Sequence, residues 1–253
     1  MPDLLIYLIA IIGAFLAGCI NTLAGNGSAI TLYLLMELLG LPPNHANATN
    51  RVGILAQVAA GSWAFGRAGK IRIKGEELLL GCITIGSIGG LYLATIISNE
   101  GFRSVFRYLL LILFVVILSK PKRWLVPAER RKEVPPWLSV PVYLALGFYA
   151  GFISMGMGVI FLAITVMWMR YDLLMANVLK TLMVIPMAIM GIIWFSSLGW
   201  IDWKLGGIMA IGQAAGGYFT AHFASRYSRA NELAYYILVV VVGLALIRLW
   251  FFA

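Results

Sequence analysis

Long apolar segments, separated by short polar stretches, run through the whole chain. Residues 4–20 read LLIYLIAIIGAFLAGCI and carry no charge. A helix that crosses a bilayer needs about 20 apolar residues, with a range of about 17–25. Ten apolar segments can be marked, at 4–24, 28–41, 52–66, 78–98, 104–119, 137–155, 159–170, 174–198, 205–224 and 233–252. The pattern predicts an all-α, polytopic membrane protein.

The second and seventh segments, 28–41 and 159–170, are too short for a full span. Each follows a glycine-rich interruption, and the glycines concerned are Gly25, Gly27, Gly156 and Gly158. Glycine allows the backbone to turn, and irregular backbone at membrane depth occurs where it is buried in protein or lines a cavity. We therefore expect broken or re-entrant helices at both motifs. Close helix packing is the alternative use of such glycines.

The ten segments divide into two groups of five. At an offset of 130 residues identities recur, from Ile30 with Ile160 to Gly86 with Gly216, and GKIRIK aligns with GWIDWK. We interpret this as an internal duplication. The divisions that it predicts are a single transmembrane domain 1–253, made of a first repeat 1–119, a cytoplasmic loop 120–136 and a second repeat 137–253.

Composition narrows the class of protein. The chain is 62% hydrophobic and 11% charged, whereas soluble domains carry about 25% charged residues. The net charge of +9 is concentrated in short loops between apolar segments. This distribution is typical of the excess of Lys and Arg in the cytoplasmic loops of membrane proteins, and we do not expect a nucleic-acid partner.

The basic residues reverse their side between the two repeats. Loop 67–77 is strongly basic and its counterpart 199–204 is balanced, whereas loop 99–103 is balanced and its counterpart 225–231 is basic. With 120–136 inside, this pattern predicts inverted-topology repeats with both termini outside. Each repeat then needs an odd number of crossings, which five spans provide, as do three spans with a non-crossing re-entrant pair. Inverted repeats with discontinuous helices are a recurring plan of secondary transporters.

Polar residues concentrate at the two interruptions and before the third and eighth segments. The stretches NHANATNR and MANVLK both place a cation three or four residues after an Ala-Asn pair. Asparagine amides, unwound backbone N–H groups, helix N-termini after Gly27 and Gly158 and one or two cations would suit a small anion. The candidate substrate-binding residues are Asn21, Asn26, Ser28, Asn47, Thr49, Asn50, Arg51, Ser154, Asn177 and Lys180.

Lys180 has apolar sequence on both sides. An ionisable residue within a membrane segment indicates a functional site by default, and the sequence offers no carboxylate close by. We therefore expect the substrate anion to be the partner of Lys180. Arg51 is expected at the mouth of the third segment, and snorkelling to the headgroup region is the alternative for both cations.

The chain lacks a Ser-His-Asp order, His or Cys residues at metal-ligand spacing, and a P-loop. We therefore expect no enzymatic activity, no catalytic residue, no metal and no cofactor. The expected partners are a small anionic substrate, the lipid bilayer and a proton or sodium coupling ion.

Two sets of motifs carry a family resemblance. The first is AGCINTLAGNGSAITLYLLMELLGLPPNHANATNRVGILAQVAAGSWAFGRAGKIRI, and the second joins GFYAGFISMGMGVIFLAI, MANVLK and SLGWIDWK. They resemble the two repeats of the sulfite exporter TauE/SafE family of bacterial membrane permeases, over residues 13–224. The resemblance implies a multi-pass transporter of the cytoplasmic (inner) membrane that exports a small sulfur-containing oxyanion or an organosulfonate. A passive anion channel with the same architecture is the alternative.

Overall fold

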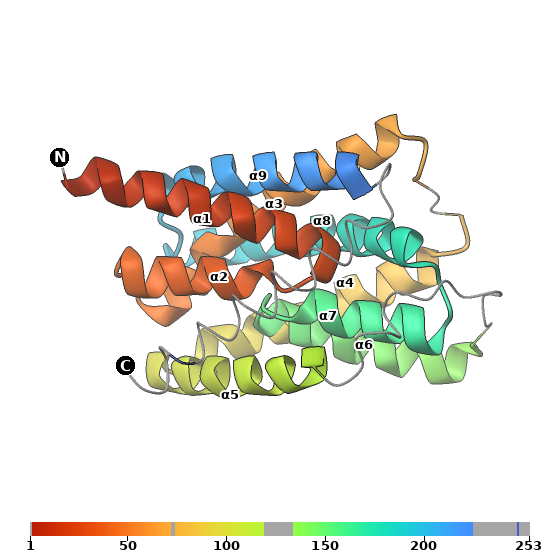
Figure 1. Ribbon diagram of the computed structural model, residues 1–253. Coiled ribbons are helices and arrows are strands. Elements are labelled where there is room, and N and C mark those ends of the chain that lie inside the picture. Colours follow the sequence, from red (N-terminus) through yellow and green to blue (C-terminus); the bar gives the residue numbers. More distant parts are fainter. Residues whose placement is uncertain (1, 72–73, 119–133, 225–246, 248–253) are drawn as a thin grey trace.

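The computed structural model describes residues 2–71, 74–118, 134–224 and 247, and this part of the chain is built from helices joined by turns (Figure 1). The all-α prediction is therefore confirmed. The helices are α1 (Pro2–Ala24), α2 (Gly27–Tyr33), η1 (Leu34–Leu38), α3 (Pro43–Arg67), α4 (Glu77–Ile96), α5 (Asn99–Leu118), α6 (Pro136–Phe152), α7 (Met157–Leu162), η3 (Ala163–Trp168), α8 (Leu173–Ser197) and α9 (Trp203–Ala224). The expected segment 233–252 apart from residue 247, the loop 225–231 and most of the loop 120–136 lie outside the described residues.

Several helices have the length and surface of membrane helices. Within the described ranges, three are long and apolar enough to cross a membrane: Leu4–Leu23, Glu77–Ile96 and Leu173–Ser197. Large apolar side chains are exposed on the outer faces of α1 and α4, among them Leu4, Leu8, Ile12, Ile85, Ile88 and Tyr92. Exposed apolar surface on this scale marks contact with lipid or another protein, so the fold is that of a membrane protein.

α1 and α6 both end inside the bundle, where the chain reverses into a short helix (Figure 1). Gly25 follows α1 with φ +78° and Gly156 precedes α7 with φ +72°, a left-handed conformation that glycine adopts without steric cost. We call α1 with α2 the first hairpin and α6 with α7 the second hairpin. In Figure 1 the first hairpin opens toward the left end of the bundle and the second toward the right end.

The short helices α2 and α7 each continue into a π-helical turn, η1 and η3. The apolar helix Gly27–Leu38 rises only about 18 Å at ~1.5 Å per residue, which is well short of the hydrocarbon core of about 30 Å. The short segments therefore cannot span a bilayer as straight helices.

The backbone repeats itself at the same spacing as the sequence. α3 spans Pro43–Arg67 and α8 spans Leu173–Ser197, so both ends differ by 130 residues. Left-handed residues recur at that offset, since Gly40 (φ 72°) corresponds to Arg170 (φ 59°), and Gly69 (φ 66°) to Gly199 (φ 69°). Helices that correspond by this offset also make corresponding contacts, because α4 packs on α6 and α9 packs on α1.

Two expected helix starts are too late. The stretch 99–103, expected as a loop before the fifth segment, forms the beginning of α5 (Asn99–Leu118). We expected the third segment to begin at residue 52, after the polar stretch 44–51, but α3 begins at Pro43 and includes that stretch. Proline is favoured at the first helical position, and the polar side chains that follow are buried in the bundle. Hydropathy hides such turns, because it counts polar residues as loop even when the protein interior supplies their partners.

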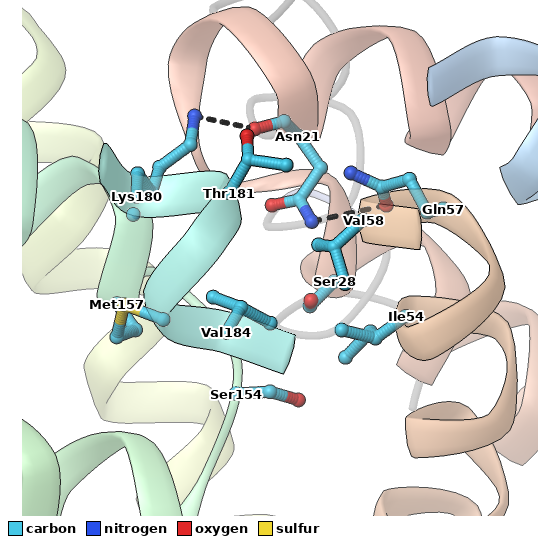
Figure 2. Close-up of a pocket in the computed structure, with 11 residues that line it drawn as sticks. Asn21, Ser28, Ile54, Gln57, Val58, Ser154, Met157, Lys180, Thr181 and Val184 are labelled. Carbon is cyan, nitrogen blue, oxygen red and sulfur yellow. Dashed lines mark hydrogen bonds between the residues drawn. The ribbon is translucent and has the colours of Figure 1, made fainter. Parts of the chain in front are cut away.

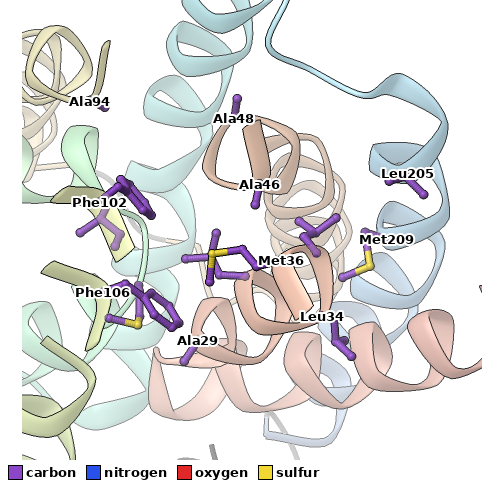
Figure 3. Close-up of a cluster of buried hydrophobic side chains, with 14 of the residues drawn as sticks. Ala29, Leu34, Met36, Ala46, Ala48, Ala94, Phe102, Phe106, Leu205 and Met209 are labelled. Carbon is purple, nitrogen blue, oxygen red and sulfur yellow. The ribbon is translucent and has the colours of Figure 1, made fainter. Parts of the chain in front are cut away.

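The core forms two large apolar clusters. One is centred on α1, α2, α3, α5 and α9 (Figure 3) and the other on α4, α6, α7 and α8. Glycines bring the cross-packed helices close together, since a Cβ on Gly86 of α4 would strike the carbonyl of Leu144, and one on Gly216 of α9 would strike that of Phe15. These two glycines serve helix packing, as membrane helices commonly use small residues.

Candidate functional site

A small cavity lies where both hairpins meet α3 and α8 (Figure 2). Its volume is about 30 Å³, which is room for about two water molecules at ~10–15 Å³ each. The described lining combines one lysine, two amides and three hydroxyl groups with apolar side chains, and no carboxylate is among these residues. The lining residues are Asn21, Ser28, Ile54, Gln57, Val58, Ser154, Met157, Gly158, Lys180, Thr181 and Val184.

Four of the ten candidate substrate-binding residues line this cavity, namely Asn21, Ser28, Ser154 and Lys180. The other six are buried but lie outside the lining, namely Asn26, Asn47, Thr49, Asn50, Arg51 and Asn177. Some of them bond to the lining or brace the helices around it. Asn50 Nδ2 donates to Ser154 Oγ at 3.5 Å, and Thr49 Oγ1 accepts from the backbone N–H of Asp202 at 3.0 Å.

Lys180 is buried, with 5% of its surface exposed. Its Nζ donates to the carbonyls of Asn21 at 2.8 Å and Thr22 at 2.9 Å, and to Asn177 Oδ1 at 2.7 Å. An ammonium group has three donors, and all three are used. The last carbonyls of a helix lack intrahelical partners and attract cations. The end of α1 and Asn177 are therefore partners of Lys180 that the sequence did not show. Our expectation that the substrate anion pairs with Lys180 stays a prediction, because Lys180 also lines the cavity.

Arg51 is 2% exposed, so it neither sits at the mouth of a segment nor reaches the headgroup region. Its Nη2 donates to the carbonyl of Gly151 and, at 3.5 Å, to that of Ala150. The guanidinium lies over the ring of Phe195, 5.3 Å from the ring centre. Arg51 therefore holds the end of α6, as Lys180 holds the end of α1.

Gln57 of α3 was missing from the candidate set. Its Oε1 accepts from Asn21 Nδ2 at 3.1 Å (Figure 2). Its Nε2 donates to Thr22 Oγ1 at 3.3 Å. The sequence did carry a signal, because a lone amide interrupts the apolar stretch ILAQVAAG. A single neutral amide is a weaker signal than a charged residue or than asparagines that recur in both halves. Thr181, beside Lys180, was missed in the same way.

The two interruptions touch each other. A Cβ on Gly25 would strike the backbone of Gly158 and Val159, and one on Gly158 would strike Gly25. Between Gly25 and α2, Asn26 is fully buried, and neither polar atom of its side chain has a partner in the described part of the chain. A buried amide without partners is costly, so Asn26 is available to a ligand or to water.

Helices with apolar outer faces, interrupted at a shared polar cavity that Lys180 lines, define a membrane protein with an internal polar site rather than a soluble binding protein. Comparison with known sequences gives the family. The sequence profile described as "Sulfite exporter TauE/SafE" matches residues 10–247. The chain belongs to this family, and the resemblance seen in its motifs is confirmed. A family of membrane permeases is also consistent with the prediction that the chain is not an enzyme.

The relatives are similar over most of their length. The chain is 27% identical to "Probable membrane transporter protein ORF9" of Sinorhizobium sp, over 97% of this chain and 93% of that protein. It is 26% identical to "Probable membrane transporter protein YfcA" of Escherichia coli K12, over 90% and 83% of the two chains. It is 28% identical to "Probable membrane transporter protein" of Haemophilus influenzae, over 85% and 82%. No solved structure matches the chain.

Proposed function

We propose that this membrane transporter is a secondary transporter that exports a small, sulfite-like sulfur oxyanion across the cytoplasmic membrane. The observation that carries the proposal is the chemistry of the cavity, where Lys180, two amides and three hydroxyl groups face a space without any carboxylate in its lining. A bound cation would be repelled by the Lys180 ammonium, with no carboxylate among the described lining residues to offset it. An anion finds donors on several sides of this cavity.

The helix ends add to this preference. Ser28 in the first turn of α2 and Gly158 in that of α7 border the cavity, and no described side chain caps either helix. The first N–H groups of a helix have no intrahelical acceptor, and the N-terminus carries roughly half a positive charge. The C-terminal ends of α1 and α6, which carry the negative end of the helix dipole, are paired with Lys180 and Arg51, respectively. The negative helix ends are thus neutralised, and the positive ends remain available to an anion.

The ten candidate residues then divide into two roles. Asn21, Ser28 and Ser154 hold the anion from the lining, and Lys180 supplies the positive charge beside it. Asn26, near Ser28 in the sequence, offers its unpaired side-chain amide. The remaining five hold the helices around it, namely Asn47, Thr49, Asn50, Arg51 and Asn177. A volume of about 30 Å³ favours a compact inorganic oxyanion over an organosulfonate, whose carbon chain needs more room.

The experiment that tests this function is counterflow of labelled sulfite, thiosulfate, sulfoacetate and taurine in proteoliposomes. We expect saturable flux of sulfite and thiosulfate that responds to a proton or sodium gradient, and much weaker flux of the two organosulfonates. Conductance that follows voltage without saturation would instead identify a passive anion channel. Flux of none of the four anions would contradict the proposed substrate class.

We further propose that the two halves are inverted-topology repeats, with divisions 1–119 and 137–253 around the cytoplasmic loop 120–136, within one transmembrane domain. The reversed loop charges support this arrangement. In Figure 1 the α3–α4 connection lies at the right end of the bundle and the α8–α9 connection at the left end, and the two hairpins open in opposite directions. Each half then contributes a non-crossing hairpin and three spans.

Cysteine labelling from the two sides of the membrane tests this topology. After replacement of the native Cys19 and Cys82, which are free thiols, a cysteine at Gly69 is expected to react only from the cytoplasm and one at Gly199 only from outside. Both glycines lie in exposed turns with similar φ angles of 66° and 69°, so the pair differs mainly in its side of the membrane. Labelling of both positions from the same side would contradict the inverted arrangement.

A further inference from the structure

The membrane-embedded end of α6 is held by side chains from the other half of the chain. Its last carbonyls are those of Ala150, Gly151 and Phe152. Arg51 donates to the first two, and Asn47 Nδ2 donates to the third at 3.0 Å. Arg51 and Asn47 lie four residues apart, on one face of α3. This one helix thus pairs three carbonyls that would otherwise face an environment without water.

In the same manner, α8 of the second half holds the end of α1 in the first half. Lys180 Nζ donates to the carbonyls at that end, and it also donates to Asn177 Oδ1. The two cations are not equivalent in sequence. At the offset of 130, Arg51 corresponds to Thr181 and Lys180 corresponds to Asn50. In both halves a cation therefore caps a helix end in the other half, but the two cations stand one position apart in the aligned repeats. The first half uses the longer arginine and the second half uses lysine.

The Arg51 side chain packs against α8 at Gly191 and Phe195. A Cβ on Gly191 would enter the space of the Arg51 side chain, and the Phe195 ring lies under the guanidinium. At the corresponding place in the other half, a Cβ on Gly61 would make only ordinary contact, 3.6 Å from Thr181 Cγ2. The absence of a side chain at Gly191 thus creates the room that Arg51 needs.

The cavity begins just beyond this capped end. Ser154 follows α6 by two residues and lines the cavity, as does Gly158 in the first turn of α7. Arg51 itself does not line it. On the basis of the proposed anion site, we propose that Arg51 is a positioning residue. By capping α6 it fixes Ser154 and the start of α7 at the cavity, and it does not contact the anion. Its planar guanidinium suits this role, because several donors can be shared between adjacent carbonyls.

Hydrogen exchange in nanodiscs without added anion tests the capping role. In Arg51→Gln, the amides of residues 153–157 are expected to exchange roughly tenfold faster or more, because the end of α6 opens more easily. Gly191→Ala is expected to act in the same direction, although Arg51 and every lining residue remain. Gly61→Ala is the matched control and should leave exchange at 153–157 unchanged. Arg51→Lys, which keeps the charge with fewer donors, should lie between the wild type and Arg51→Gln.

Sulfite binding to the same proteins separates the possible outcomes. If Arg51→Gln weakens sulfite binding while exchange at 153–157 stays at the wild-type rate, Arg51 is an anion ligand and the positioning role is wrong. Unchanged exchange in both Arg51→Gln and Gly191→Ala would also overturn it. If the wild type binds no sulfite but exchange responds as expected, the proposed function fails and the capping role stands. Gly191→Ala covers the case in which Arg51→Gln does not fold.

Discussion

Replacing Lys180 with glutamine is expected to weaken binding of the transported anion tenfold or more. Among the described residues that line the cavity, Lys180 is the only charged one, so the substitution removes the charge that an anion would meet. At an effective dielectric constant of about 20, two unit charges ~4 Å apart attract each other by about 4 kcal/mol, and about 1.4 kcal/mol corresponds to a factor of ten in affinity. Isothermal titration with sulfite on purified protein, together with counterflow, measures the loss.

The structure adds a second effect to this prediction. The Lys180 ammonium also bonds to the carbonyls of Asn21 and Thr22. The Asn21 carbonyl keeps the backbone N–H of Gly25 at 3.1 Å, whereas an unpaired Thr22 carbonyl would cost about 1–3 kcal/mol. Glutamine is shorter but keeps two N–H donors, so the variant should fold with a reduced melting temperature. Lys180→Arg should retain part of the affinity, because the charge remains while the geometry changes.

Lys204→Gln is the matched control, because Lys204 is exposed and bonds to the Tyr7 hydroxyl at 3.0 Å, away from the cavity. The control makes the same change in net charge and should leave sulfite affinity unchanged. Normal affinity in a folded Lys180→Gln protein would limit Lys180 to its role at the end of α1. An equal loss in Lys204→Gln would indicate a long-range effect of net charge.

Gly25→Ala is expected to produce the largest loss of stability among these variants, and with it the loss of transport. The new Cβ would strike the backbone of Gly158 and Val159, so the two interruptions would have to separate. Overpacking costs about 1–3 kcal/mol even where side chains can adjust, and here the obstacle is backbone. The left-handed φ of +78° adds roughly 1–2 kcal/mol for a residue with a side chain. Thermal unfolding and counterflow measure both effects.

Gly69→Ala isolates the contact between the interruptions. Gly69 also has a left-handed φ, +66°, but a Cβ there would meet nothing within 4 Å. The difference between the two alanine variants therefore reports the packing of one interruption against the other. Gly158→Ala should repeat the loss, whereas Gly207→Ala, in open space on α9, should not. Similar stabilities for Gly25→Ala and Gly69→Ala would contradict the close contact.

The class of the protein could be predicted from the sequence because its signals are local. Runs of apolar residues determine which segments form buried or lipid-facing helices, and glycines such as Gly25 and Gly156 allow the turns between them. The spacing of 130 residues recurs in the bounds of α3 and α8, since similar segments form similar helices. The motifs also gave the family. Polar residues in apolar surroundings marked four residues of the cavity, Lys180 among them, because burying a polar group has a cost wherever it occurs.

Only the tertiary structure decided what each polar residue does. Lys180 lies 159 residues from Asn21, and Arg51 lies 100 residues from Gly151, yet each pair is hydrogen-bonded. A buried cation needs acceptors, and the sequence does not distinguish a substrate from the free carbonyls of a distant helix end. For the same reason the sequence placed the start of the third helix too late and passed over Gln57. The free energy of a buried polar group depends on the partners that surround it in space, and in this protein those partners come from the other half of the chain.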